Sequence, residues 1–233
     1  MNHDTDIAKK TAEILLNIGA VNFKKDQPYE FASGIKSPIY MNCRAPIFHP
    51  DELKTLMALA IEKISPLIKK KNIAVIAGGE TAGIAYAMYL AKQFHLPMVY
   101  VRKKPKSYGM NKLIEGGLAS GAQTLLVEDL ATNGDSKIHF VKSLHNAEFL
   151  CHDSFVIFYY GIFDLAKEMT DLNITLHYLT TAHDIFTVAK EKNLFDKTTL
   201  SIVEEFIADP MGWSQKANTD KANKLISNLS GML

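Results

Sequence analysis

Between about residue 72 and residue 180, the sequence alternates short apolar runs with segments of helical periodicity. The runs are IAVIA, PMVYVR, TLLVE, SFVIFYY and ITLHYLT. Strands that are apolar throughout are buried on both faces, as in parallel sheets covered by helices on each side. The alternation therefore predicts an α/β fold with a doubly wound, mainly parallel sheet as the core over residues 71–185.

Two flanking regions complete the predicted organisation. Residues 1–70 are expected to form a helix through TAEILLNIGAV, two extended pieces around YEF and PIYMNCR, and a second helix that begins near Pro50. Residues 186–233 are expected to form helices to about Asp209, followed by a polar tail that holds the single tryptophan, Trp213. The sequence gives almost no indication of what this tail does.

The segment TLLVEDLATNGDSK places polar chemistry at the end of a predicted strand. Two carboxylates, Glu128 and Asp129, precede a small polar loop over residues 131–136, which opens the next helix. Ligands of open α/β sheets bind beyond the carboxyl ends of strands, and the N–H groups of a helix N-terminus bind phosphate. Carboxylates there suit sugar hydroxyls or a hard cation such as Mg2+. The segment indicates a ribose-phosphate site, although these residues could simply end a strand and cap a helix.

A cluster of cations follows another predicted strand. Arg102, Lys103, Lys104 and Lys106 lie in RKKPK, directly after the run PMVYV. This position places them at the same sheet edge as the polar loop, and the Gly- and Ser-containing segment that follows is typical of a loop that closes over a ligand. The alternative is an ordinary solvated face, which is the usual role of a charge run.

Composition and missing motifs exclude several classes of protein. Neither GxxxxGK[ST] nor a strand-linked GxGxxG occurs, which argues against P-loop and dinucleotide-binding folds. The net charge of +1 argues against broad binding to nucleic acid. The two distant cysteines, Cys43 and Cys151, favour a reducing compartment. The polar N-terminus and the shortness of the most apolar run favour a cytoplasmic protein without a membrane partner.

LLVEDLATNGDS resembles the motif of type I phosphoribosyltransferases that binds phosphoribosyl pyrophosphate (PRPP). Three further segments, YEFASGIKSPIYMNCR, AGGETAG and RKKPKSYGMNKLIEG, resemble the base-covering hood, the pyrophosphate turn and the catalytic loop of orotate phosphoribosyltransferases. The resemblance covers about residues 10–185. It implies the type I phosphoribosyltransferase fold and a Mg2+-dependent homodimer with a shared catalytic loop. It also implies the conversion of orotate and PRPP to orotidine 5′-monophosphate and pyrophosphate in UMP (pyrimidine) biosynthesis.

The resemblance also implies a role for individual residues. The catalytic ligands of the departing pyrophosphate are expected to be Arg102, Lys103 and Lys106. The residues expected to bind PRPP are Thr81, Ala82, Tyr108, Glu128, Asp129, Leu130, Ala131, Thr132, Asn133, Gly134, Asp135 and Ser136. Orotate is expected to lie against Tyr40, Met41, Thr132 and Tyr160, with Arg44 close behind. No direct metal ligand is expected, because PRPP carries the Mg2+, with possible help from Glu128 and Asp129.

Three positions depart from the family pattern. Ala32 and Ala82 stand where many members have lysine, and Asp135 stands where the PRPP loop usually has a small residue. A further carboxylate beside a phosphate is unfavourable unless its side chain points away or contacts the metal. The alternatives left open are a purine phosphoribosyltransferase of the same fold, a non-catalytic regulator that senses PRPP, and a degenerate paralogue that Asp135 has impaired.

Overall fold

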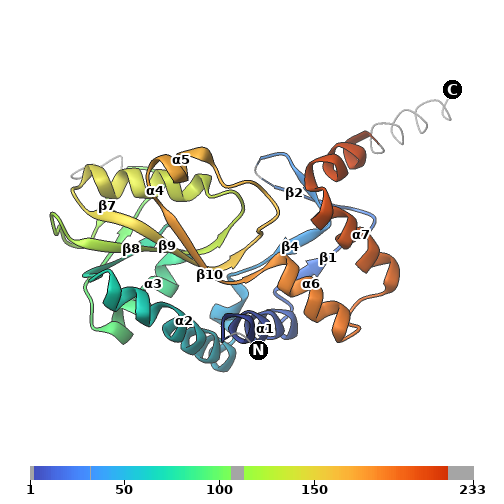
Figure 1. The fold of residues 1–233 in the computed structure, drawn as a ribbon, viewed down its shortest axis with the longest axis horizontal. Coiled ribbons are helices and arrows are strands. Elements are labelled where there is room, and N and C mark those ends of the chain that lie inside the picture. Colours follow the sequence, from blue (N-terminus) through green and yellow to red (C-terminus); the bar gives the residue numbers. More distant parts are fainter. Residues whose placement is uncertain (1–2, 32, 106–112, 220–233) are drawn as a thin grey trace.

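The computed structural model describes residues 3–31, 33–105 and 113–219. Its centre is a six-stranded sheet with the spatial order β10 (Thr175–Thr181), β9 (Leu150–Tyr159), β8 (Gln123–Ala131), β5 (Val75–Gly79), β6 (Met98–Val101) and β7 (Ile114–Glu115) (Figure 1). Neighbouring strands from β10 to β6 are parallel. Strand β7 is antiparallel to β6 and lies in a segment that was predicted to be a polar loop. The predicted mainly parallel sheet is confirmed.

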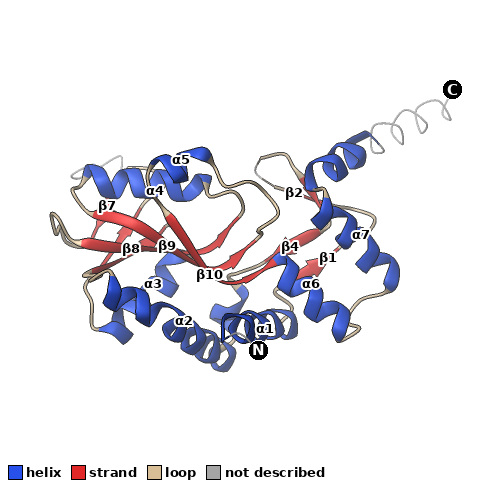
Figure 2. Ribbon diagram, viewed as in Figure 1, coloured by secondary structure: helices blue, strands red, loops and turns tan. Residues whose placement is uncertain are grey.

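Helices cover both faces of this sheet (Figure 2). The helices on one face are α1 (His3–Asn17), α2 (Pro50–Lys70) and α3 (Gly83–Phe94), and those on the other are α4 (Asp135–Asn146) and α5 (Lys167–Asp171). Alternate residues of a strand belong to different cores: Ile76 packs with α1, α2 and α3, whereas Val75 and Ala77 pack with α4. Because both faces are buried, β5 and long stretches of β8 and β9 are apolar, whereas the partly exposed edge strand β10 keeps several polar residues.

The N-terminal region forms a hood of two small antiparallel sheets. One pairs β1 (Val21–Phe23) with β4 (Ile39–Met41), and the other pairs β2 (Tyr29–Glu30) with β3 (Lys36–Ser37). A short 3-10 helix, η1 (Ala45–Phe48), then leads to α2. The helix predicted to run through Val21 ends instead at Asn17. Gly19 has a φ of +68°, which stops the helix and turns the chain into β1.

The C-terminal region contains α6 (Ala182–Glu191) and α7 (Lys197–Ala208), and a further helical run over residues 210–219. Helix α7 ends before Pro210, as predicted, but the tail after it is helical as far as it is described. Pro210 occupies the first position of that run, where proline is well tolerated because its missing N–H has no helical partner. In Figure 1 this run lies beside β2 of the hood.

The parallel strands bring their carboxyl ends to one edge of the sheet. Gly79 pairs with Val101, and Ala131 pairs with Tyr159, so the chain leaves β5, β6, β8 and β9 on the same side. The loops predicted to carry chemistry come directly after these strand ends. The fold therefore places them together, with the hood next to them.

Candidate active site

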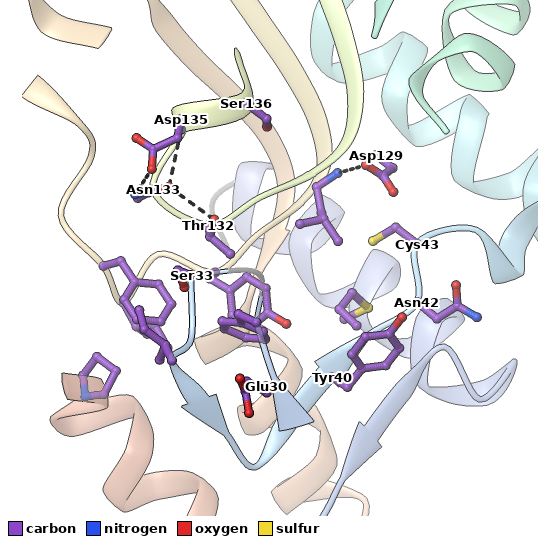
Figure 3. A pocket seen from close by; sticks show the side chains of 18 of the residues that line it. Glu30, Ser33, Tyr40, Asn42, Cys43, Asp129, Thr132, Asn133, Asp135 and Ser136 are labelled. Atoms are coloured by element: carbon purple, nitrogen blue, oxygen red, sulfur yellow. Dashed lines mark hydrogen bonds between the residues drawn. The ribbon is translucent and has the colours of Figure 1, made fainter. Parts of the chain in front are cut away.

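A cavity of about 830 Å³ lies between the carboxyl edge of the sheet and the hood (Figure 3). A volume of this size is typical of pockets for small-molecule ligands. Its walls come from the hood, the loop after β8, the segment after β9 and the start of the C-terminal helical run. They are formed by Glu30, Phe31, Ser33, Ile35, Tyr40, Met41, Asn42, Cys43, Arg44, Asp129, Leu130, Thr132, Asn133, Asp135, Ser136, Tyr160, Ile162, Phe163, Asp164, Pro210 and Met211.

The loop after β8 is shorter than the sequence indicated. Ala131 still belongs to the strand, and its carbonyl accepts a hydrogen bond from the Tyr160 N–H at 2.9 Å. The chain turns at Gly134, which has a φ of +93° and lies so close to Met169 that a Cβ would overlap its sulfur. Helix α4 then begins at Asp135. The Asp135 N–H already donates to Asn133 Oδ1 and the Lys137 N–H to the Gly134 carbonyl, so an anion at this helix N-terminus is attracted by the remaining N–H groups of the first turn and by the helix dipole.

The two adjacent carboxylates at the end of β8 face different surroundings. Asp129 lines the cavity, and its Oδ1 accepts the Leu130 N–H at 2.9 Å (Figure 3). Glu128 is 6 % exposed and lies outside the cavity wall. It packs against Gly79 and Gly83, where an added Cβ would meet the Glu128 carboxylate. In this structure Asp129 is therefore the carboxylate available to a ligand in the cavity.

Glu128 has a buried partner that was not predicted from the sequence. The Lys137 side chain is 2 % exposed, and its Nζ lies 3.2 Å from Glu128 Oε2. The same ammonium donates to the Ser136 hydroxyl at 3.0 Å and to the Leu130 carbonyl. Burial raises the pKa of Glu128, and the charge of Lys137 opposes that shift. Lys137 thus joins the end of β8 to the first turn of α4.

A sequence signal for Lys137 exists. The buried face of α4 carries Val141 and Leu144, and Lys137 precedes these residues by four and seven positions. Residues at that spacing share one face of a helix. A lysine on an apolar face is buried only with a charged partner, and Glu128 and Asp129 are the carboxylates upstream of it at the end of the preceding strand.

The unexpected carboxylate, Asp135, lies on the cavity wall and is hydrogen-bonded within its own loop. Its Oδ2 accepts from Asn133 Nδ2 at 2.7 Å, and its backbone N–H donates to Asn133 Oδ1 at 3.3 Å (Figure 3). The Thr132 hydroxyl donates to the same Asn133 oxygen at 3.3 Å. The Asn133 amide therefore holds the Asp135 carboxylate within its own loop. The Asn133 N–H also occupies one of the acceptor positions of that carboxylate.

The hood side of the cavity is aromatic. Tyr40 is 43 % exposed and packs on Tyr29, with 4.9 Å between the ring centroids. Tyr160 is 2 % exposed and packs edge-on against Phe31 at 5.2 Å and Phe158 at 4.8 Å. Burial raises the pKa of Tyr160, so its hydroxyl stays protonated. These rings form a largely apolar wall suited to a planar ligand.

The cavity wall also contains a cysteine, Cys43, which is 1 % exposed. Burial raises the pKa of its thiol well above the ordinary value, and the negative charge of Asp129 adds to the effect. A thiol that stays protonated is a poor nucleophile. Cys43 is therefore a packing residue rather than a covalent catalyst.

Several predicted residues lie at the same sheet edge but outside the cavity wall. The Lys103 N–H donates to Glu80 Oε2 at 2.7 Å, which joins the basic segment to the turn that contains Thr81 and Ala82. The Arg102 N–H donates to the Leu113 carbonyl at 2.8 Å. Thus one cavity unites the residues expected to contact orotate with most of the loop expected to bind PRPP, and the turn with Thr81 and Ala82 lies beside the described part of the basic segment. Three positions singled out in the sequence, Ala32, Lys106 and Tyr108, lie outside the described residues.

Histidines and acidic residues form no metal cluster in the described part of the chain. Within residues 3–31, 33–105 and 113–219, no group of three or more His, Cys, Asp or Glu residues is arranged to hold a metal ion. No helix over the same ranges is long and apolar enough to cross a bilayer. The imidazole of His177, in β10, lies with its Nε2 2.8 Å from Asp153 Oδ1.

Comparisons with known proteins give relatives over almost the whole chain. No family model matches. The chain is 45 % identical over 214 residues to the orotate phosphoribosyltransferase of Ruegeria sp. (strain TM1040), covering 91 % of this chain and 94 % of the relative. It is 41 % identical over 222 residues to the Agrobacterium fabrum protein of the same name, covering 93 % and 96 %. The crystal structure of orotate phosphoribosyltransferase from Aeropyrum pernix has a similar fold, with a TM-score of 0.67, 21 % identity, and coverage of 79 % of this chain and 99 % of that one.

Proposed function

Because the chain belongs to the orotate phosphoribosyltransferase family, we infer that it transfers the phosphoribosyl group of PRPP to N1 of orotate. The products are orotidine 5′-monophosphate, the precursor of UMP, and pyrophosphate. The family, the type I phosphoribosyltransferase fold and the reaction expected from the motifs are confirmed. The relatives favour orotate over the purine and regulatory alternatives.

One observation supports the assignment of this reaction to residues of the cavity. A single cavity unites the carboxylate and hydroxyls of the phosphate loop, from Asp129 to Ser136, with the aromatic hood residues Tyr40 and Tyr160. A phosphorylated sugar needs hydroxyl-binding carboxylates and anion-binding amides, and a planar base needs an apolar slot. The cavity has both the polar wall for a phosphorylated sugar and the apolar wall for a planar base, and the two walls face the same open volume.

The phosphoribosyl half of the substrate is assigned to the loop after β8. We place the 5′-phosphate on the backbone N–H groups of residues 131–136, with the Thr132 and Ser136 hydroxyls as further donors. Asp129 is assigned to the ribose hydroxyls because its carboxylate lines the cavity. For Glu128 the same role stays a prediction, since its carboxylate is paired with Lys137 here.

The donor set at the cavity fits a Mg2+ ion carried by PRPP. Asp129 supplies a hard carboxylate oxygen, and the phosphates of PRPP supply the others. When bound, the ion neutralises part of the negative charge of the diphosphate. The residues of this chain would bind the parts of PRPP that surround the ion.

The base half is assigned to the hood. Orotate is placed between Tyr40, Met41 and Tyr160, with Thr132 at the ring edge and Arg44 near its carboxylate. This position directs N1 towards the ribose C1, which becomes oxocarbenium-like as pyrophosphate leaves. No protein nucleophile is required, because catalysis consists of orientation and charge stabilisation.

The leaving group is assigned to the basic segment. Arg102 and Lys103 follow β6 at the edge that carries the cavity, and Lys106 and Tyr108 complete the predicted set. Cations that meet pyrophosphate during its departure stabilise the transition state more than the bound substrate. Thr81 and Ala82 lie in the turn that the Lys103 N–H contacts through Glu80, and they are assigned to the same pyrophosphate.

Lys103→Ala tests this assignment. We expect kcat to fall by about 100-fold, with the KM of each substrate changed by less than about threefold, because the lost charge acts on the leaving group. The backbone hydrogen bond to Glu80 survives the substitution. Turnover is followed by the loss of orotate absorbance after addition of PRPP and Mg2+.

Lys104→Ala is the matched control, since Lys104 is an exposed neighbour without an assigned role. It should keep near-wild-type kcat. Unchanged turnover in Lys103→Ala, or an equal loss in both variants, would remove this lysine from the mechanism. If the wild type fails to consume orotate, the reaction assignment itself fails.

We also propose a cytoplasmic homodimer that shares the catalytic loop. Two observations support association: Ile47 and Phe48 in η1 are 46 % and 85 % exposed, and Met88 in α3 is 57 % exposed. The Tyr86 hydroxyl donates to the Cys43 carbonyl at 2.5 Å, which holds α3 near the segment leading to η1. Sedimentation equilibrium should give twice the chain mass of 26.0 kDa.

The free, buried cysteines agree with a reducing compartment.

A further inference from the structure

The C-terminal helical run reaches the cavity. Pro210 and Met211 belong to its wall, together with Tyr40 and Asp129. Met211 is 51 % exposed, so its side chain stands at the opening rather than in the core. The four motifs that identify the family lie between residues 29 and 136 and give no role to this part of the chain.

The run is held at its start by Asp209. Asp209 Oδ1 accepts the Gly212 N–H at 2.9 Å, and the Asp209 carbonyl accepts the Trp213 N–H at 3.0 Å. Gly212 lies so close that a Cβ there would overlap the Asp209 carboxylate. This is N-capping of a helix that begins at proline, and it fixes the direction in which Met211 leaves the backbone.

The run is also anchored to the hood. Ser214 is 5 % exposed, and its hydroxyl accepts the backbone N–H of Lys36, in β3, at 2.8 Å. The Lys36 ammonium pairs with Glu30, which is part of the cavity wall. The C-terminal run is therefore bonded to the hood sheet on the base side of the cavity.

A chain of aromatic contacts supports the same position. Trp213 packs edge-on against Phe206 at 5.5 Å, and Phe206 packs against Phe163 at 6.4 Å. Phe163 lines the cavity and contacts Phe31 of the hood at 6.3 Å. Aromatic rings that meet edge-on bury a large apolar area and resist displacement. The helical run that carries Met211 is thus fixed in place by these aromatic contacts.

We propose that Met211 is a specificity-determining residue that forms the outer wall of the orotate half of the site, and that Ser214 positions it. The inference rests on the proposed function, since it takes the hood side of the cavity as the base site. A flexible thioether at the opening excludes water from one edge of a planar base without adding charge. The loop after β8 comes from a different part of the chain than Met211, so we expect truncation of Met211 to act mainly on the base.

The test measures the KM for orotate and the KM for PRPP separately in each variant. Met211→Ala should raise the KM for orotate by about tenfold, the value of a few methylene contacts, and leave the KM for PRPP within about twofold. Met211→Leu should return the orotate KM towards the wild-type value. Ser214→Ala should shift the orotate KM in the same direction by a smaller factor. Leu194→Ala is the control, because Leu194 is similarly exposed and lies outside the cavity wall.

The outcomes distinguish a failure of the proposed wall from a failure of the proposed function. If the wild type consumes orotate and Met211→Ala leaves its KM unchanged, or raises both constants alike, the proposed wall is wrong while the function stands. If the wild type does not consume orotate with PRPP, the function fails and this inference fails with it.

Discussion

Removing Lys137 tests the buried ion pair at the base of the phosphate loop. Lys137→Met keeps a long side chain in a site that is 2 % exposed and removes the only charge within 4 Å of Glu128 in the described part of the chain. It also removes the donors to the Ser136 hydroxyl and the Leu130 carbonyl. The loop loses its link to β8, and the carboxylate stays buried.

The magnitude comes from the burial of both partners. Breaking a buried ion pair by removing one partner costs about 3–5 kcal/mol. The cost depends on pH, because burial already raises the pKa of Glu128 above its ordinary value of 4.5, and losing Lys137 raises it further. A carboxyl with a raised folded-state pKa binds more protons when folded, so the free energy of unfolding falls as pH rises between the two values. The variant's deficit should therefore grow as pH rises above the ordinary value of 4.5. At low pH it should approach the cost of the two lost hydrogen bonds, about 1–3 kcal/mol.

The assay is urea unfolding at one fixed protein concentration, analysed from the midpoint and slope at each pH. The matched control is the double variant Glu128→Gln with Lys137→Met, which removes both charges. At pH 8 it should recover about 2 kcal/mol relative to Lys137→Met alone, because no uncompensated charge remains. A double variant no more stable than the single one, or a deficit that does not change with pH, would refute the assignment of an ion pair.

Two further predictions concern the turn after β8 and the far end of the sheet. Gly134→Ala should cost at least about 2 kcal/mol, because a Cβ at φ +93° overlaps Met169. Gly121→Ala, at φ +74° in open space, controls for backbone strain, and equal losses would contradict the overlap. Burial raises the pKa of Asp153, but the His177 hydrogen bond and nearby cations outweigh it, and the net shift is downward. The wild type's advantage over Asp153→Asn, about 1–2 kcal/mol, should be full above the ordinary value of 3.8 and should be lost as pH falls through the lowered pKa of the folded state, so an advantage that does not shrink on acidification refutes it.

The sheet could be predicted because its signal is local. A strand buried on both faces is mainly apolar, and the runs within β5, β8 and β9 meet that condition, whereas the edge strand β10 is partly exposed and keeps polar residues such as Thr175 and His177. The two-residue strand β7 could not be predicted, since its pairing depends on where β6 lies rather than on its own composition. The end of α1 was missed for a similar reason: one glycine in a positive-φ conformation outweighed an apolar pattern that continued to Val21.

Residues of the site could be predicted where a polar side chain directly follows the end of a strand. Asp129, Thr132 and Ser136 were identified because the carboxyl ends of parallel strands gather ligands, and all three line the cavity. The roles of Glu128 and Asp129 were harder to separate. The sequence places a turn directly after them, whereas β8 continues to Ala131. Neighbouring side chains of a strand point to opposite faces, so only one of the two carboxylates lines the cavity.

The C-terminal wall of the cavity lies beyond what any local pattern can encode. Its anchor joins residues 178 positions apart, Lys36 and Ser214, through one backbone hydrogen bond. Lys36 belongs to the hood motif, but the motif does not indicate a partner for its backbone N–H, and a serine on a helix is usually a surface residue. On the proposed assignment, substrate choice at the base can change through residues such as Met211 while the loop after β8 stays the same, since the two halves of the site come from different segments of the chain. Motifs for phosphate binding identify the reaction, whereas the shape of the base slot has to be read from the folded chain.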